Sequence, residues 1–161
     1  AKRLNERKDH EGSVWEHPYQ CTLVQSGQHL LNCIRYVNLN MVRAGEVEHP
    51  AEWRWCSHDE LVGTRRRYRI LDLERLCESL DIDNASQVAS LYVDGIEKQL
   101  EGNGLEREPH WTQAVAVGDE DFIRKAGGLY TDPHRFAATA TDSTDHSSPW
   151  MLREDDAPYE A

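Results

Sequence analysis

The stretch SGQHLLNCIRYVNLNMVRAG, residues 26–45, carries the most regular helical pattern in the chain. At about 100° per residue, its aliphatic side chains fall on one broad face. That face consists of Leu30, Leu31, Ile34, Val37, Met41 and Val42. Ser26 is a suitable N-cap and Gly45 a stop signal. The pattern therefore predicts a helix from Gln28 to about Arg43 that turns its aliphatic face to the core.

The opposite side of this predicted helix is polar. It presents His29, Asn32, Cys33, Tyr36, Asn40 and Arg43. Tyr36 and Asn40 stand at i and i+4, so their side chains lie one turn apart and can approach one atom together. A tyrosine on the flank of an amphipathic helix usually packs, and an asparagine near a helix end often caps. Spacing alone favours these structural roles over a catalytic one.

The wider string changes that balance. RYVNLNMVRAGEVEHPAEWRW (35–55) closely resembles the signature of the REP-associated tyrosine transposases, which are single-tyrosine HUH transposases. GSVWEHPYQCTLV (12–24) is similar to the aromatic segment that precedes the tyrosine helix in that family. RYRILDLERLCESL (67–80) and REPHWTQAVAVGDEDFI (107–123) are similar to the C-terminal extension of one subgroup. The resemblance is most specific at 35–55.

The resemblance implies a ferredoxin-like α+β domain that holds a divalent metal ion, Mg²⁺ or Mn²⁺. In the family the ligands are a His-hydrophobic-His pair on a strand and a polar residue one turn beyond the nucleophilic tyrosine. By position, Tyr36 matches the nucleophile and Asn40 the metal-binding residue. The metal would activate a phosphate towards a phenol that is otherwise a poor nucleophile at neutral pH. Attack on single-stranded or hairpin DNA would leave a 5′-phosphotyrosine and a free 3′-OH.

The sequence departs from the family in one decisive respect, because it contains no His-x-His pair. Its histidines are His10, His17, His29, His49, His58, His110, His134 and His146. Only 35 residues precede Tyr36, whereas the family places the pair well upstream on a central strand. One amide cannot hold a catalytic cation. We therefore expect that an upstream part of the domain is missing, that this chain binds no metal, and that alone it does not cleave DNA.

Charge is divided unevenly along the 161 residues. Residues 1–70 hold 11 Lys+Arg and 9 Asp+Glu, whereas residues 71–161 hold 7 and 20, within a net charge of −11. A phosphate-binding surface is therefore expected in the first half. The four cysteines show no C-x-x-C pair, and the sequence has no run long and apolar enough for a membrane span. These features favour a cytoplasmic protein with no membrane partner.

Further elements follow from local signals. A short extended segment is expected at 19–24 and a short helical or irregular aromatic segment at 51–63. Helices are expected at 72–80 and 86–100. An extended piece followed by a helical turn at 119–125 comes next, and a flexible tail is expected from 129. The 86–100 helix should bury Val88, Leu91, Tyr92, Ile96 and Leu100.

Several other groups have two interpretations each. RRRYR (65–69) is either a phosphate-binding patch with Tyr68 stacking on a base, or a solvated turn. Trp53 and Trp55 are either a base-stacking platform or, the favoured interpretation, core packing. Glu46, Glu48 and Glu52 are favoured as a solvated acidic loop over a metal cluster. The acidic second half is favoured as a solubilising surface over a partner-binding extension.

The resemblance, taken with these features, implies an α+β fold that is a mainly helical remnant of a ferredoxin-like HUH domain. Residues 1–63 would be the C-terminal part of the catalytic domain, 64–127 a helical extension, and 128–161 a flexible acidic tail. The predicted function is single-stranded or hairpin DNA processing, with Tyr36 and Asn40 as inherited catalytic and metal positions. DNA would be bound by Arg43, Arg65, Arg66, Arg67 and Arg69. The alternative is a non-enzymatic DNA-binding or protein-interaction module, and an uncovered apolar face at 30–42 would favour a homodimer.

Overall fold

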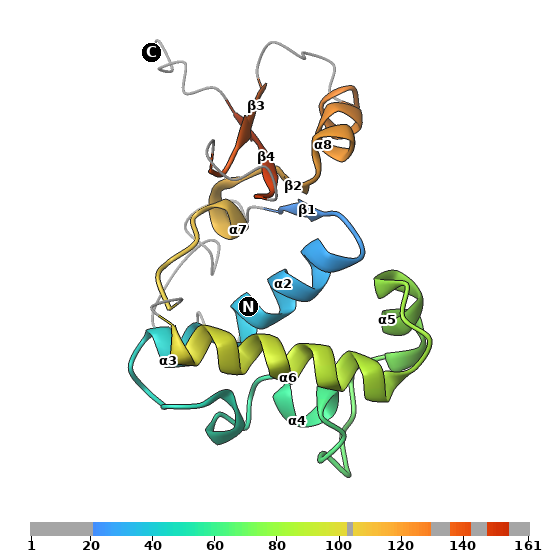
Figure 1. Cartoon of the computed structure of the whole chain (residues 1–161), viewed down its shortest axis with the longest axis vertical. Coiled ribbons are helices and arrows are strands. Elements are labelled where there is room, and N and C mark those ends of the chain that lie inside the picture. The colour runs from blue at the N-terminus through green and yellow to red at the C-terminus, as the bar shows by residue number, and fades with distance from the viewer. Residues whose placement is uncertain (1–20, 103–104, 130–135, 143–147, 155–161) are drawn as a thin grey trace, which may run out of the picture.

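The fold is α+β, with a helical layer at one end of the molecule and a small sheet at the other (Figure 1). The computed structural model describes residues 21–102, 105–129, 136–142 and 148–154. The elements are β1 (Leu23–Val24), α2 (Gln28–Asn38), α3 (Asn40–Arg43), the 3-10 turn η1 (Pro50–Glu52), α4 (His58–Leu61), α5 (Leu73–Leu80), α6 (Ala85–Glu101), α7 (His110–Gln113), β2 (Ala116–Gly118), α8 (Glu120–Gly127), β3 (Phe136–Ala140) and β4 (Trp150–Glu154). Among the described residues, no helix is both long enough and apolar enough to cross a membrane.

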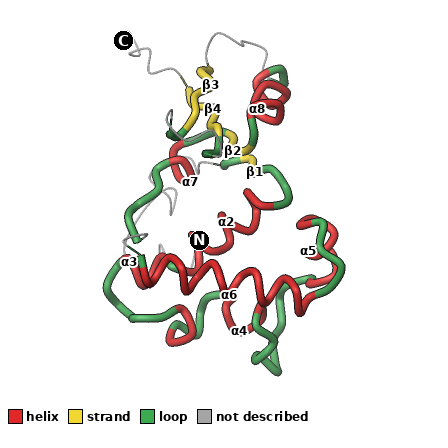
Figure 2. The backbone as a smooth tube through the Cα atoms, viewed as in Figure 1, coloured by secondary structure: helices red, strands yellow, loops and turns green. Residues whose placement is uncertain are grey.

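The helical layer is built around α6, which runs beneath α2 in Figures 1 and 2. Asn84 caps α6 by accepting a hydrogen bond from the backbone N–H of Gln87. The predicted stripe is confirmed for Val88, Tyr92 and Ile96, which are all buried, while Leu91 is exposed. One core joins α2, α3, α4, α5 and α6; its buried members are Leu31, Leu39, Val42, Leu61, Leu80, Val88, Tyr92 and Ile96. Helices on both sides of the predicted boundary at residue 63 therefore share one core.

The sheet has the strand order β1-β2-β4-β3. β1 is parallel to β2, and the other two pairings are antiparallel. Helix α8 packs on the sheet, where Ile123 and Ala126 meet Leu152 of β4. The expected flexible tail is therefore wrong for 136–140 and 150–154, which pair with each other and extend the sheet. The rest of that tail beyond residue 129, apart from 141–142 and 148–149, lies outside the described residues.

The tyrosine helix forms where it was predicted, with differences at both ends. The N-cap is Gly27 rather than Ser26, and no side chain caps the helix. Gly27 has φ 75°, a conformation that glycine adopts without steric cost. A break at Leu39 separates α2 from α3.

The predicted faces of this helix are only partly right. Leu31 and Val42 are buried, so the expectation of an uncovered apolar face is wrong for them: they lie in one core with residues of α5 and α6. Val37, predicted to face the core, is 56% exposed, whereas Tyr36 on the polar strip is 6% exposed. Tyr36 and Cys33 of the polar strip pack in a second cluster with Trp111 and Val117, whereas Asn40 of the same strip is exposed.

Candidate functional site

Tyr36, the predicted nucleophile, lies in a packed environment. The guanidinium of Arg43 sits 4.0 Å from the centre of the Tyr36 ring. The Trp111 ring lies 6.2 Å from the Tyr36 ring, centre to centre, at an interplanar angle of 39°. A phenol held between a guanidinium and an indole is stabilised by cation–π and aromatic contacts. The side chain therefore contributes to the junction between α2 and α7.

Arg43 donates hydrogen bonds to both residues of the predicted catalytic pair, Tyr36 and Asn40. Its Nη1 donates to the Tyr36 carbonyl oxygen at 2.9 Å and to Asn40 Oδ1 at 2.8 Å. Arg43 Nε and Nη2 are buried without a hydrogen-bond partner among the described residues. Burial lowers the pKa of Arg43, an effect opposed by the nearby Tyr36 and Glu108. Arg43, one of the predicted DNA-binding residues, thus has intramolecular partners here.

A short segment around α7 covers the tyrosine. Glu108 accepts a hydrogen bond from Trp111 Nε1 at 3.0 Å and lies 3.4 Å from His110 Nε2. Burial lowers the pKa values of His29 and His110, and it raises the pKa of Cys33. We call this group the tyrosine cluster; it comprises His29, Cys33, Tyr36, Arg43, Glu108, His110 and Trp111.

The position that the resemblance assigns to a metal ion lies beside Asn40. Within the described residues, no three His, Cys, Asp or Glu side chains are placed to hold a metal ion together. Asn40 is exposed, but its Oδ1 accepts the hydrogen bond from Arg43. A guanidinium therefore occupies the space beside the amide oxygen that the resemblance assigns to a metal ion.

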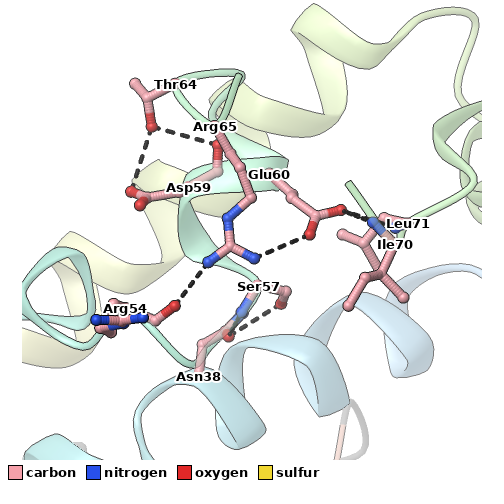
Figure 3. Close-up of polar contacts among 9 residues, drawn as sticks. All are labelled: Asn38, Arg54, Ser57, Asp59, Glu60, Thr64, Arg65, Ile70 and Leu71. Atoms are coloured by element: carbon pink, nitrogen blue, oxygen red, sulfur yellow. Dashed lines mark hydrogen bonds and ion pairs between the residues drawn. The ribbon is translucent and has the colours of Figure 1, made fainter. Parts of the chain in front are cut away.

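The predicted basic patch is attached to the fold through a buried carboxylate, Glu60 of α4 (Figure 3). Glu60 Oε2 accepts the backbone N–H groups of Ile70 and Leu71, each at 2.7 Å, and Oε1 binds Arg65 Nη1 at 3.2 Å. These contacts, led by the Leu71 N–H bond, lower the pKa of Glu60 despite its burial. Glu60 closes the loop at both ends. Sequence reasoning missed it because nothing local distinguishes it from its neighbour Asp59.

The five predicted DNA-binding arginines therefore divide into two groups. Arg65 is an anchor, since its Nη2 also donates to the Arg54 carbonyl oxygen at 2.6 Å (Figure 3). Arg66, Arg67 and Arg69 are exposed. We call residues 65–70 the arginine loop. Within this loop Tyr68 is 89% exposed with φ 56°. The side chain of Ile70, at the end of the loop, is 85% exposed.

A buried amide fixes the start of α4, and with it the position of Glu60. Asn38, at the end of α2, accepts hydrogen bonds at 3.0 Å from both the backbone N–H and the hydroxyl of Ser57 (Figure 3). His58 Nδ1 lies 3.2 Å from the hydroxyl of the fully buried Tyr92. These contacts connect α2, α4 and α6 through polar groups inside the core, and they hold the arginine loop relative to the tyrosine helix.

The favoured packing interpretation of the tryptophan pair is wrong for one of its members. Trp55 is 71% exposed, and the Arg54 guanidinium lies 4.1 Å from the centre of its ring. Trp53 is half-buried. Glu46, Glu48 and Glu52 are all exposed, as a solvated loop requires.

Comparisons with protein-family models, with curated proteins and with solved structures find no match to this chain.

Proposed function

We propose that this chain is a transposase-derived protein that binds single-stranded or hairpin DNA through the arginine loop, without itself cleaving the strand. The observation that supports this most directly is the way Glu60 fixes the loop. Three contacts hold Arg65, Ile70 and Leu71, while the guanidinium groups between them are left at the surface. A pre-ordered loop loses less conformational entropy on binding. Exposed arginines on such a loop suit phosphate contacts.

The proposed ancestry is a ferredoxin-like HUH domain of which a mainly helical remnant is present. Its support is the resemblance of residues 35–55 to the family signature, together with the placement of Tyr36 and Asn40 on the adjacent helices α2 and α3. In this proposal, Mg²⁺ or Mn²⁺ is a cofactor of the full-length members of the family. The proposed setting is the cytoplasm, which is supported by the sequence pattern alone. The homodimer predicted from an uncovered apolar face at 30–42 loses that support, because Leu31 and Val42 are buried in the core.

Salt-dependent DNA binding tests the proposal. Fluorescence anisotropy with a labelled DNA hairpin at several salt concentrations should give log Kd that depends linearly on log salt concentration. Each phosphate contact on a single strand contributes about 0.7 to the slope. The double variant Arg66→Glu/Arg67→Glu should lower that slope by about 1.4 and weaken binding more than about tenfold at low salt.

A matched control comes from the other end of the molecule. Lys125 is exposed on α8, which lies far from α4 along the long axis (Figure 1). Arg124, next to it, is also exposed, so Arg124→Glu/Lys125→Glu changes the net charge by the same amount as the double variant in the arginine loop. Its salt slope should equal that of wild type. Equal losses in both variants would mean that overall charge, rather than the arginine loop, determines binding, and the proposal would be wrong.

Strand cleavage through Tyr36 is tested separately. The chain is incubated with the same hairpin and either Mg²⁺ or Mn²⁺, and covalent protein–DNA adducts are sought by denaturing electrophoresis. We expect none, because the phenol is packed under Arg43 and Trp111. An adduct present in wild type and absent in Tyr36→Phe would restore the catalytic role.

A further inference from the structure

Trp55 stands out among the tryptophans that the structure describes. Trp111 is 9% exposed, Trp53 and Trp150 are half-buried, and Trp55 is 71% exposed. The Arg54 guanidinium covers one face of its ring at 4.1 Å. The guanidinium lies over one face of the indole, so a further planar group would stack on the opposite face, next to a positive charge. Tryptophan is enriched at binding interfaces, because the indole offers a large apolar face together with one polar group.

The backbone on either side of Trp55 is held in place. The Arg54 carbonyl accepts the Arg65 guanidinium, and the Cys56 N–H donates to the Trp53 carbonyl at 3.1 Å. Cys56 Sγ also lies 3.3 Å from the Pro50 carbonyl. The indole therefore projects from a turn that is hydrogen-bonded on both sides.

A second exposed aromatic stands on the other side of the same anchor. Tyr68 is three residues beyond Arg65, and its φ of 56° is a left-handed conformation that costs a bulky residue energy. The strain is maintained because Glu60 fixes both Arg65 and Ile70. The Arg65–Arg54 hydrogen bond thus connects a turn bearing Trp55 to a loop bearing Tyr68, with Arg66, Arg67 and Arg69 beside it.

We infer that Trp55, backed by Arg54, is a stacking site for an unpaired nucleobase, and that Tyr68 offers a second such face. This inference depends on the proposed DNA binding and adds the group that is recognised. Aromatic faces interleaved with guanidinium groups suit a strand whose bases are unstacked and whose phosphates lie alongside. Bases inside a duplex cannot present their faces to an indole, so the site selects unpaired nucleotides.

The test compares three labelled ligands of equal phosphate number: an oligothymidylate, the same strand with abasic sites, and a blunt duplex. Trp55→Ala should weaken binding of the oligothymidylate about 5- to 100-fold. It should leave binding of the abasic strand and the duplex close to wild type, because these offer no free base. Trp55→Phe should recover most of the loss, and Tyr68→Ala should show a smaller loss with the same selectivity. Denaturation midpoints of all three variants should match wild type, because both side chains are exposed.

The outcomes separate this inference from the proposed function. A loss in Trp55→Ala that is equal for the abasic strand and the oligothymidylate, or no loss at all, would overturn base stacking while leaving electrostatic binding intact. Protein that binds none of the three ligands would overturn both. Selective loss with Trp55→Ala, rescued by Trp55→Phe, would support the site. If Trp55→Ala failed to fold, a selective loss of oligothymidylate binding in Tyr68→Ala would still support stacking, and no such loss would contradict it.

Discussion

The tyrosine cluster and the arginine loop place the same two residue types in opposite settings. Tyr36 is 6% exposed with an arginine over its ring, whereas Tyr68 is 89% exposed on a loop with three exposed arginines. The first belongs to the strongest motif in the sequence, and the second to a short basic run. A motif records which residues occur together, while tertiary packing decides which of them a ligand can reach.

The two regions also differ in what their polar groups contact. In the tyrosine cluster, Arg43 leaves Nε and Nη2 buried without hydrogen-bond partners among the described residues. At the base of the arginine loop, the buried carboxylate of Glu60 accepts three hydrogen bonds. Buried polar groups that have hydrogen-bond partners stabilise one conformation, whereas buried polar groups without partners lower the stability of the fold around them. We therefore expect the cluster to depend on apolar packing and the loop on one carboxylate.

The largest effect is expected from Trp111→Ala. The indole is buried against Tyr36 and Val117, so its removal should lower the free energy of unfolding by about 3 kcal/mol. Urea denaturation measures the loss, and tetranitromethane should nitrate Tyr36 faster once its cover is removed. Trp55→Ala, which removes the same side chain from the surface, should change stability by less than about 0.5 kcal/mol. Comparable losses in the two variants would contradict the contrast between the regions.

Glu60→Ala should have the next largest effect, about 2–3 kcal/mol. It leaves the N–H groups of Ile70 and Leu71 and the Arg65 guanidinium without their acceptor. The released loop should be cut by trypsin after Arg66 or Arg67 at concentrations that spare wild type. Asp59→Ala is the matched control, since among the described residues Asp59 Oδ1 accepts only a Thr64 hydroxyl, at 3.2 Å. This substitution should cost under about 1 kcal/mol. A loop that stays resistant in Glu60→Ala would show that other contacts hold it.

Acid should affect the two regions in different pH windows. Burial lowers the pKa values of His29 and His110 in the tyrosine cluster. These neutral imidazoles contribute stability above the unfolded pKa of about 6.5, and that contribution is lost as pH falls below it. The lowered pKa of Glu60 contributes stability above about pH 4.3, which is lost only in stronger acid.

Urea denaturation across this pH range checks the two windows. His110→Gln should flatten the decline below about pH 6.5, and Glu60→Gln should flatten the decline below about pH 4.3. If the free energy of unfolding of His110→Gln depended on pH as that of wild type does, protonation of His110 would not account for the decline in stability.

Sequence predicted the elements whose signals are local. Asn84 and Asp72 cap helices close to where they were expected, and the spacing of Val88, Tyr92 and Ile96 identified the buried side of α6. The burial of Tyr36 depends on Trp111, 75 residues later, and no periodicity within α2 encodes that contact. Strand β3, with the sequence FAATA, has little strand character of its own and forms by pairing with β4. The role of Glu60 likewise depends on tertiary structure, because its carboxylate accepts the backbone N–H groups of Ile70 and Leu71, ten and eleven residues later.

The smallest effect, and the one that separates ancestry from present function, is expected from Tyr36→Phe. The ring keeps its contacts with Arg43 and Trp111, so the free energy of unfolding should change by less than about 1 kcal/mol. Tyr36→Ala, which removes the ring, should cost about 3 kcal/mol. DNA affinity should be unchanged in Tyr36→Phe, because binding is assigned to the arginine loop. If loss of this one hydroxyl instead weakened hairpin binding while stability stayed constant, the phenol must reach the DNA. The tyrosine cluster would then have to open in the complex, and the two regions would form a single site.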